Sequence, residues 1–133
     1  MKYLLDTNIC IYIINNRPSK VIGKLRKFKS EEIGISVITL SELQKGVSKS
    51  HHKKKNQQVL DNFTSVFKIL PFEELDAKVY GEIVVKLERL GQIIGGNDLF
   101  IAAHSLSRRL TLVTNNEKEF DRVEGFKVEN WAK

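Results

Sequence analysis

Short apolar runs alternate with segments of helical periodicity along almost the whole chain. Residues 2–5 and 33–36 are runs of the strand type, and each is followed by a segment with the spacing of a helix. Strands that alternate with helices in this way are typical of an α/β domain with a largely parallel sheet. The chain has 133 residues, enough for one such domain with a real core, which we expect to span residues 1–133.

The pattern places most elements individually. Strands are expected at residues 2–5, 33–36, 67–70, 111–114 and 126–129. Helices are expected at residues 9–15, 19–29, 57–67 and 75–90, the last with the clearest amphipathic spacing and a stop at Gly91. Two more helices are marked by their first residues. The run from Thr39 to Glu42 has the form of a capping box, and Asn97 fits the cap of a helix that continues to about Arg108.

Positive charge is concentrated in one part of the chain. The formal net charge is +6, and residues 17–55 hold 11 Lys and Arg against three acids. Such a sector suits an anionic partner, nucleic acid first, although a solvated helix face with a lysine-rich loop explains it equally well. The candidate RNA contacts in this sector are Lys45, Lys49, Lys53, Lys54 and Lys55.

Membrane and secretory segments are not expected. No run approaches the roughly 20 apolar residues of a membrane span, and Asp6 interrupts the apolar opening too early for a signal peptide. The single cysteine, Cys10, lies in an apolar run and is interpreted as a small buried hydrophobe. We expect a soluble, cytoplasmic protein with no membrane association.

Acidic residues stand where predicted strands end or helices begin. Asp6 follows the first strand, Glu42 lies in the first turn of the helix after the second, and Asp98 heads a later helix. The polar run 114–116 closes another strand, with Glu119 shortly after it. Taken singly, each has an ordinary explanation as a turn residue, a capping-box partner or an acid at a helix N-terminus.

Taken together, these positions map to one rim of a parallel sheet, at the reversal point where ligands bind. Carboxylates gathered there would repel one another, and a divalent cation would remove that penalty. Oxygen ligands suit Mg²⁺ or Mn²⁺ better than zinc. The histidines compete poorly as ligands, because His51 and His52 fall in the basic loop and His104 lies inside a helix, as a core or surface residue.

Four segments, in order and spacing, resemble a known family. They are YLLDTNICIYII, SVITLSELQKGV, GGNDLFIAAHSL and LTLVTNNEKEF. Over nearly its whole length the sequence resembles the PIN-domain ribonucleases, and more closely the VapC toxins of bacterial VapBC toxin–antitoxin pairs. The resemblance implies a three-layer α/β/α sandwich with a mainly parallel sheet, and metal-dependent cleavage of RNA phosphodiesters.

The resemblance also assigns the metal site. Asp6, Glu42 and Asp98 fall on the family's three metal-binding acids, with Mg²⁺ or Mn²⁺ as the implied cofactor. At the fourth catalytic position Asn116 stands where many members have Asp, and Glu119 is a close alternative. One ion held by the first three acids is therefore the safer expectation.

Neighbouring polar side chains are expected to orient these carboxylates. Thr7 and Asn8 follow Asp6 directly, and Thr114 ends a strand of the same sheet. Outer groups of this kind commonly fix the direction of metal-binding side chains.

The family's partners are implied in the same way. Members act as homodimers and are held inactive by a small antitoxin of the VapB type, which forms larger toxin–antitoxin complexes. DNA is contacted only indirectly, through the antitoxin. The expected substrate is RNA, with tRNA favoured and the anticodon loop of initiator tRNA first, so that cleavage inhibits translation.

Other interpretations stay open. A PIN-like nuclease that acts on other RNA or on DNA shares the acid arrangement, and an inactive RNA-binding module would share the fold. A nucleotide-binding enzyme fits less well, because residues 91–96 lack the lysine and hydroxyl of a phosphate-binding loop.

Overall fold

The computed structural model describes residues 1–133 and has a five-stranded sheet at its centre. The strands are β1 (Tyr3–Leu5), β2 (Ile33–Ser36), β3 (Lys68–Leu70), β4 (Thr111–Val113) and β5 (Val128–Glu129). They lie in the order β3-β2-β1-β4-β5, and every neighbouring pair is parallel. In the central strand Leu4 lies opposite Gly34 on one side and Leu112 on the other. The predicted parallel sheet is confirmed.

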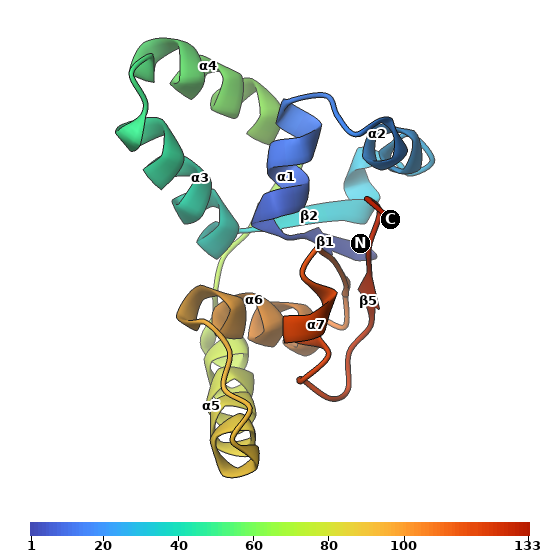
Figure 1. Ribbon diagram of the computed structural model, residues 1–133, viewed down its shortest axis with the longest axis vertical. Coiled ribbons are helices and arrows are strands. Elements are labelled where there is room, and N and C mark those ends of the chain that lie inside the picture. Colours follow the sequence, from blue (N-terminus) through green and yellow to red (C-terminus); the bar gives the residue numbers. More distant parts are fainter.

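Helices cover both faces of this sheet (Figure 1). They are α1 (Thr7–Ile14), α2 (Ser19–Leu25), α3 (Val37–Lys49), α4 (Lys53–Thr64), α5 (Glu74–Leu90), α6 (Gly96–Ser107) and α7 (Glu117–Phe120), with one turn of 3-10 helix, η1 (Ser30–Glu32). One face carries α1, α2 and the α3–α4 hairpin, and the other carries α5, α6 and α7. The three-layer α/β/α sandwich is therefore confirmed. None of the helices has both the length and the hydropathy that a membrane crossing requires.

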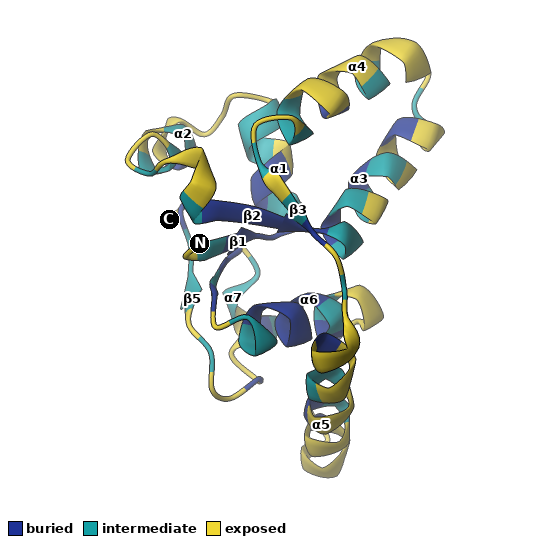
Figure 2. Ribbon diagram, turned by 180° about the vertical axis from the view of Figure 1, so that it is seen from behind, coloured by how far each residue is buried: buried dark blue, intermediate teal, exposed yellow.

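Alternation along the strands divides the core into two clusters. Leu4 and Leu112 pack with α5, α6 and α7, whereas Leu5 and Val113 pack with α1, α2, α3 and α4. Successive strand residues point to opposite faces, so each short strand serves both clusters. In Figure 2 the sheet is mostly buried, while the far end of α5 and the tip of the α3–α4 hairpin are largely exposed.

The start of α3 differs from the expectation. The predicted capping box is wrong, because α3 begins at Val37 and its N-cap is Ser36, whose hydroxyl accepts a hydrogen bond from the backbone N–H of Ile38. The chain turns from strand to helix at the first hydroxyl available after β2. Thr39 is therefore buried within the helix, and Glu42 lies in its second turn with its side chain free for other contacts.

Other helix boundaries also differ. Helix α4 begins at Lys53, four residues earlier than expected, and α6 begins at Gly96 without a side-chain cap from Asn97. The start of α4 was missed because its first turn consists of lysines, and positive charge is unfavourable at a helix N-terminus. Packing offsets this, because the side-chain amides of Gln44 and Gln57 pair across the α3–α4 hairpin.

Two further corrections are smaller. Helix α2 ends at Leu25, shorter than expected, and α7 was not expected at all. Helix α7 has only four residues, too few to show helical periodicity, and it is anchored by the fully buried ring of Phe120. It places Glu119 beside the start of α6.

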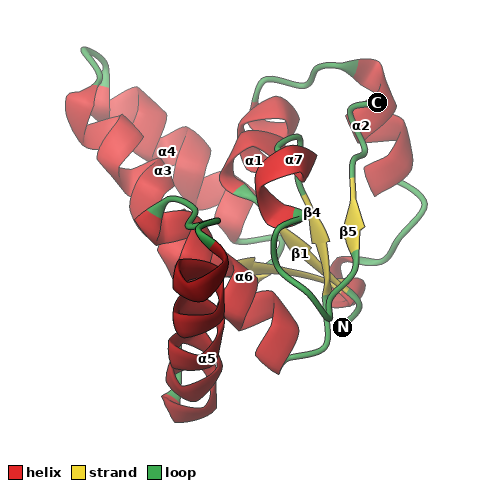
Figure 3. Ribbon diagram, turned by 60° about the horizontal axis from the view of Figure 1, so that its bottom comes forward, coloured by secondary structure: helices red, strands yellow, loops and turns green.

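The strand order reverses between β1 and β4. From β1 the chain proceeds outward through β2 and β3, and it then returns to the other side of β1 to form β4 and β5. Figure 3 shows β1 and β4 side by side, with α1 and α7 close to them. A crevice at this position is where open α/β sheets bind their ligands.

Candidate active site

Asp6 ends β1 at the reversal point and is held from several sides. Its Oδ1 accepts a hydrogen bond from the backbone N–H of Thr7 at 2.8 Å, so Asp6 is the N-cap of α1. Its Oδ2 accepts from the hydroxyl of Thr114 at 2.6 Å and from the side-chain amide of Asn8 at 3.4 Å. The hydroxyl of Thr114 joins β4 to β1 across the reversal point. The three residues expected to orient carboxylates thus all contact Asp6.

Glu42 reaches the same edge from α3. Its Oε1 accepts a hydrogen bond of 2.6 Å from the hydroxyl of Thr7. Thr7 therefore binds Asp6 through its backbone and Glu42 through its side chain. Because α3 begins at Val37, Glu42 lies beyond the capping position and its side chain is available for this contact.

Asp98 and Glu119 meet on the other side of the edge. Asp98 lies in the first turn of α6, close enough to Glu119 for the two carboxyls to shift each other's pKa. Glu119 Oε1 accepts from the backbone N–H of Gly95 at 2.7 Å, and Oε2 accepts from the side-chain amide of Asn116 at 2.7 Å. Asn116 and Glu119 are thus adjacent members of one cluster, with Glu119 as the carboxylate nearest Asp98.

Gly95 is the member of this arrangement that the sequence did not single out. A Cβ at Gly95 would lie 3.5 Å from Glu119 Oε1 and 3.8 Å from Asp98 Oδ2. The signal was the pair Gly95-Gly96 immediately before an acid at a helix start, where the backbone closely approaches another group.

The four carboxylates, here called the acidic edge, perturb one another. They are Asp6, Glu42, Asp98 and Glu119. Burial, with the negative charges of Asp6 and Glu119, raises the pKa of Asp98 to about 7. Burial also raises the pKa of Asp6, against the hydrogen bonds from Thr114 and Thr7. The hydrogen bond from the backbone N–H of Gly95 lowers the pKa of Glu119, so of these two carboxyls Glu119 is the more acidic and Asp98 the more readily protonated.

No basic side chain forms a salt bridge with the acidic edge, although the positive charge of Arg122 contributes to the lowered pKa of Glu119. None of the salt bridges in the structure involves any of its four acids. Cys10 offers no nucleophile nearby, because its thiol is fully buried and burial raises its pKa. The edge is therefore an uncompensated set of oxygen donors.

This donor set fits a hard divalent cation. Carboxylate oxygens are the ligands that Mg²⁺ and Mn²⁺ prefer, and a cation would relieve the repulsion that raises the pKa of Asp98. The acids do not form a ready-made cage, since no three His, Cys, Asp or Glu side chains are close enough together to hold one ion. Binding would require side-chain rotations, as expected for carboxylates that repel one another.

The five candidate lysines lie on the α3–α4 hairpin. Lys45 is one turn beyond Glu42 on α3, and Lys49 is one turn further. Lys53, Lys54 and Lys55 form the first turn of α4, not a loop, and all five side chains are exposed. In Figure 1 the hairpin projects from the body, so its lysines extend from beside the acidic edge to the far tip.

An apolar cleft of about 260 Å³ lies beside Glu42. It is formed between α1, α3 and α4, and its apolar lining comes from Ile11, Ile14, Leu43, Val47, Val59 and Leu60. Ile11 is 44% exposed and Val59 is 39% exposed. Large aliphatic side chains this accessible, next to a polar centre, are typical of a surface that a partner covers.

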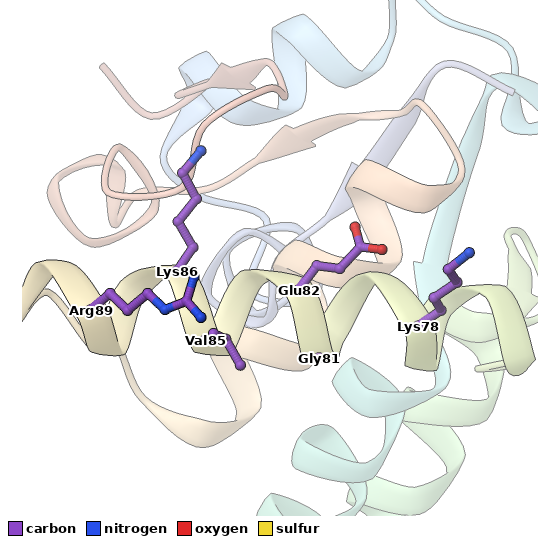
Figure 4. Close-up of a pocket in the computed structure, with 6 residues that line it drawn as sticks. All are labelled: Lys78, Gly81, Glu82, Val85, Lys86 and Arg89. Carbon is purple, nitrogen blue, oxygen red and sulfur yellow. The ribbon is translucent and has the colours of Figure 1, made fainter.

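A separate hollow of about 660 Å³ lies on the outer side of α5. Figure 4 shows its residues in a row along this one helix, namely Lys78, Gly81, Glu82, Val85, Lys86 and Arg89. None of the acids of the acidic edge lines it. Lys86 is engaged in a salt bridge with Glu124 at 2.5 Å, and the hollow holds no cluster of catalytic groups.

The sheet topology and the acidic edge define a PIN-type α/β domain. The PIN domain family model matches residues 3–125. The chain belongs to the PIN-domain family and, within it, to the VapC ribonucleases, the toxins of VapBC toxin–antitoxin systems.

Two curated relatives match almost end to end. Ribonuclease VapC2 of Rickettsia felis is 48% identical, and the alignment covers 100% of both chains. The tRNA(fMet)-specific endonuclease VapC of Shigella flexneri is 39% identical, with 99% of each chain covered.

Solved structures agree with the fold. A Rickettsia felis VapBC2 complex bound to a DNA fragment from its promoter matches with a TM-score of 0.90 and 47% identity, covering 98% of this chain and 99% of that one. A DNA-bound VapBC from Salmonella typhimurium matches with a TM-score of 0.93 and 38% identity, covering 98% of each chain.

Proposed function

We propose that this VapC-family ribonuclease hydrolyses RNA phosphodiesters with a divalent cation, Mg²⁺ or Mn²⁺, held by Asp6, Glu42 and Asp98. The observation that carries the proposal is the acidic edge itself. Its acids meet at the reversal point of a parallel sheet, burial together with the neighbouring carboxylates raises the pKa of Asp98 and Asp6, and no Lys or Arg forms a salt bridge with them. Glu119 is the fourth carboxylate, and Asn116 orients it through its side-chain amide.

The chain's own residues prepare the site. When bound, the cation supplies Lewis acidity that polarises the phosphodiester and favours the attack of water. Thr7 and Thr114 fix Asp6 in direction, and Thr7 also fixes Glu42. Asp98 would hold the cation in its deprotonated form, although its raised pKa favours the protonated form more than in an ordinary aspartate. Hydrolysis would proceed without a covalent enzyme intermediate, since the edge is a set of acids without a Ser, Cys or His triad and the single cysteine, Cys10, is buried.

The test is cleavage of RNA by the purified protein with Mg²⁺ and with EDTA, and by the variants Asp6→Asn and Asp98→Asn. Chelation and either substitution should abolish cleavage. Near-full activity in either variant would contradict the proposal. Binding of RNA without cleavage by the wild type would instead favour an inactive RNA-binding module.

We infer that the substrate is tRNA, with the initiator tRNA first. Relatives from Shigella flexneri and Salmonella typhimurium, at 39% and 37% identity, are named tRNA(fMet)-specific endonucleases. The lysines of the α3–α4 hairpin would hold the phosphate backbone beside the acidic edge. Sequencing of RNA 5′ ends after brief induced expression, with Asp6→Asn as the control, identifies the cut. Cleavage confined to other RNAs, or of flap DNA in vitro, would overturn the assignment.

We further infer that a VapB-type antitoxin covers the apolar cleft and the acidic edge. The relatives in the solved structures are VapBC complexes. The cleft would take apolar side chains of the antitoxin, and an uncompensated acidic edge would accept an arginine from it. DNA would then be contacted only through the antitoxin. Ile11→Lys should weaken co-purification with the antitoxin encoded beside this chain, whereas Lys78→Ala on α5 should not.

A homodimer and a cytoplasmic site of action complete the proposal. Light scattering at micromolar concentration should give about twice the 15.3 kDa chain mass, and a mass near 15.3 kDa would contradict the dimer. The proposed tRNA substrate is cytoplasmic, so a fluorescent fusion of the Asp6→Asn variant should distribute through the cytoplasm.

A further inference from the structure

A histidine is fully buried in the last turn of α6, outside the acidic edge. His104 Nδ1 lies 2.8 Å from the hydroxyl of Ser36, and Nε2 lies 3.1 Å from the carbonyl oxygen of Pro71. The ring of Phe72 packs edge-on against the imidazole, with 5.4 Å between ring centroids. The proposed chemistry at the acidic edge makes no use of this residue.

The contacts fix which nitrogen carries the proton. The carbonyl oxygen of Pro71 can only accept, so Nε2 carries the hydrogen. In the neutral ring Nδ1 is then an acceptor, and it receives the hydroxyl hydrogen of Ser36. The imidazole therefore acts as a donor toward the β3–α5 loop and as an acceptor toward α3.

Ser36 is the N-cap of α3, and the bond to His104 completes its hydrogen bonding. Its hydroxyl oxygen accepts from the N–H of Ile38 at 3.1 Å while its hydrogen points to Nδ1. Helix α3 carries Glu42 six residues after Ser36, and α6 carries Asp98 six residues before His104. One imidazole thus joins the start of one acid-bearing helix to the last turn of the other.

The charges around His104 favour the neutral ring. Burial lowers its pKa, and the positive charge of Arg108 acts in the same direction. Asp76 Oδ2, 3.7 Å from Nε2, and the more distant Glu73 act against them without reversing the shift. Protonation would add a hydrogen at Nδ1 and turn the Ser36 hydroxyl hydrogen away from its only acceptor there.

Ser36, His104 and Asp76 superficially resemble a nucleophilic triad. All three are completely buried, with 0% exposure, so no substrate reaches the Ser36 hydroxyl. The set is a structural link and not a second hydrolytic site.

We propose that His104 is a positioning residue, which holds the N-terminus of α3 against α6 and so sets the separation of Glu42 and Asp98. The inference rests on the proposed metal site. Groups that orient metal ligands typically alter metal affinity by about 10–100-fold when they are removed. The effect should reach the acidic edge although His104 touches none of its acids.

The test measures Mn²⁺ binding to the purified protein by isothermal titration calorimetry well below its melting temperature. His104→Leu should weaken Mn²⁺ binding at least about 10-fold. His104→Asn, whose Oδ1 can accept from Ser36, should restore binding to within about threefold of the wild type. Ser36→Gly provides the same test from the other side, since glycine remains an acceptable N-cap but has no hydroxyl to donate.

The matched control is Ile83→Ala on α5, a buried core residue in the cluster that includes α6. It should lower the melting temperature comparably to His104→Leu and leave Mn²⁺ affinity unchanged. A ¹⁵N–¹H correlation spectrum should show His104 as the neutral Nε2–H tautomer, with an Nδ1 shift that moves in Ser36→Gly.

The outcomes separate the two proposals. If the wild type binds Mn²⁺ and His104→Leu binds it with the same affinity, the positioning role of His104 is overturned and the metal site stands. The same holds if Ile83→Ala loses as much Mn²⁺ affinity as His104→Leu. If the wild type takes up no Mn²⁺, the proposed metal site fails and the inference fails with it.

Discussion

Two sets of shielded carboxylates lie in this small fold, and only one of them is neutralised. Asp76 is fully buried, and burial by itself would raise its pKa. Hydrogen bonds from Arg108, Ser107 and the backbone N–H of Glu73 outweigh burial and hold the pKa of Asp76 below its usual range. At the acidic edge, by contrast, the pKa of Asp98 is raised to about 7.

The difference lies in what surrounds each acid. Arg108 Nη2 lies 3.1 Å from Asp76 Oδ2, whereas no Lys or Arg forms a salt bridge with Asp6, Glu42 or Asp98. A buried acid without a partner costs stability, so an uncompensated cluster at the reversal point of a sheet is a mark of function. The fold supplies a cationic partner, Arg108, at Asp76, and it supplies no Lys or Arg salt bridge to the acids of the acidic edge.

The largest expected effect is at the acidic edge. Asp98→Asn removes a proposed ligand, and kcat/KM for RNA cleavage should fall by at least about 100-fold. Removing a group that only orients a ligand costs up to about this factor, and removing the ligand itself should cost at least as much. The same change removes a repelled charge, so the melting temperature in EDTA should be unchanged or higher. Asp61→Asn, on exposed α4, is the control for both measurements. A large loss of stability in Asp98→Asn would mean that the edge is structural like Asp76.

Replacing Arg108, the charged partner of Asp76, should have the opposite effect and lower stability. Arg108→Met leaves the buried carboxylate without its charged partner and should cost about 2–3 kcal/mol of unfolding free energy, since Arg108 itself is partly exposed. Urea denaturation measures the loss. Arg89→Met, an exposed arginine on α5, should stay within about 0.5 kcal/mol of the wild type. A loss below about 1 kcal/mol for Arg108→Met would show that Asp76 does not depend on this pair.

Proton linkage gives a smaller and more specific test. The pKa of Asp98 is raised on folding, so the folded state binds the extra proton and stability should rise as pH falls from 8 through about 7. Urea denaturation in EDTA at several pH values should therefore show the wild type approaching Asp98→Asn in stability below pH 7. The gap at pH 8 should be about 1 kcal/mol, reduced by solvent at this half-buried site.

The raised pKa of Asp6 gives a trend of the same sign as that of Asp98, but it is present in both the wild type and Asp98→Asn, so it does not change the gap between them. Burial lowers the pKa of His104, which destabilises the fold as pH falls through the usual histidine range, but this contribution is common to both variants. The benefit of Asp76 is lost only in strong acid, below the usual aspartate pKa of about 3.9. A gap that does not change between pH 8 and 5 would contradict the raised pKa of Asp98.

The smallest effect is expected from the α3–α4 hairpin. Replacing Lys53, Lys54 and Lys55 by Gln should raise KM several-fold while kcat stays near the wild-type value. The log–log salt dependence of RNA binding should flatten by about 0.7 for each phosphate that the lysines no longer neutralise. Lys20→Gln and Lys24→Gln on α2 are the matched controls. If the salt dependence of RNA binding is unchanged, these lysines do not contact phosphates and form only a solvated helix face.

The sequence predicted the strands of this structure better than the starts of its helices. All five strands and the parallel sheet follow from short apolar runs separated by helical segments, because each strand has to bury both faces. Helix starts were less accurate. Ser36, not Thr39, caps α3, and α7 has too few residues to carry a periodic signal.

The candidate site divides in the same way. Residue type and position at strand ends were enough to select Asp6, Glu42 and Asp98 as acids of one rim. Thr7, Asn8 and Thr114 were predicted to orient carboxylates, but the sequence did not show which acid each of them contacts. The bond between Thr7 and Glu42 spans 35 positions, and that between Asp6 and Thr114 spans 108. Only the folded chain places Asn116 and Glu119 side by side, so that one orients the other.

The sequence by itself thus determined the order of elements, the acids at their ends and the family to which the chain belongs. These features depend on local sequence, that is, on the periodicity of apolar residues and on residue type. The tertiary structure decided which acids receive a partner. Folding brings Arg108 to Asp76 and His104 to Ser36, but it brings no cation to Asp98, and such pairings depend on contacts between segments far apart in the chain.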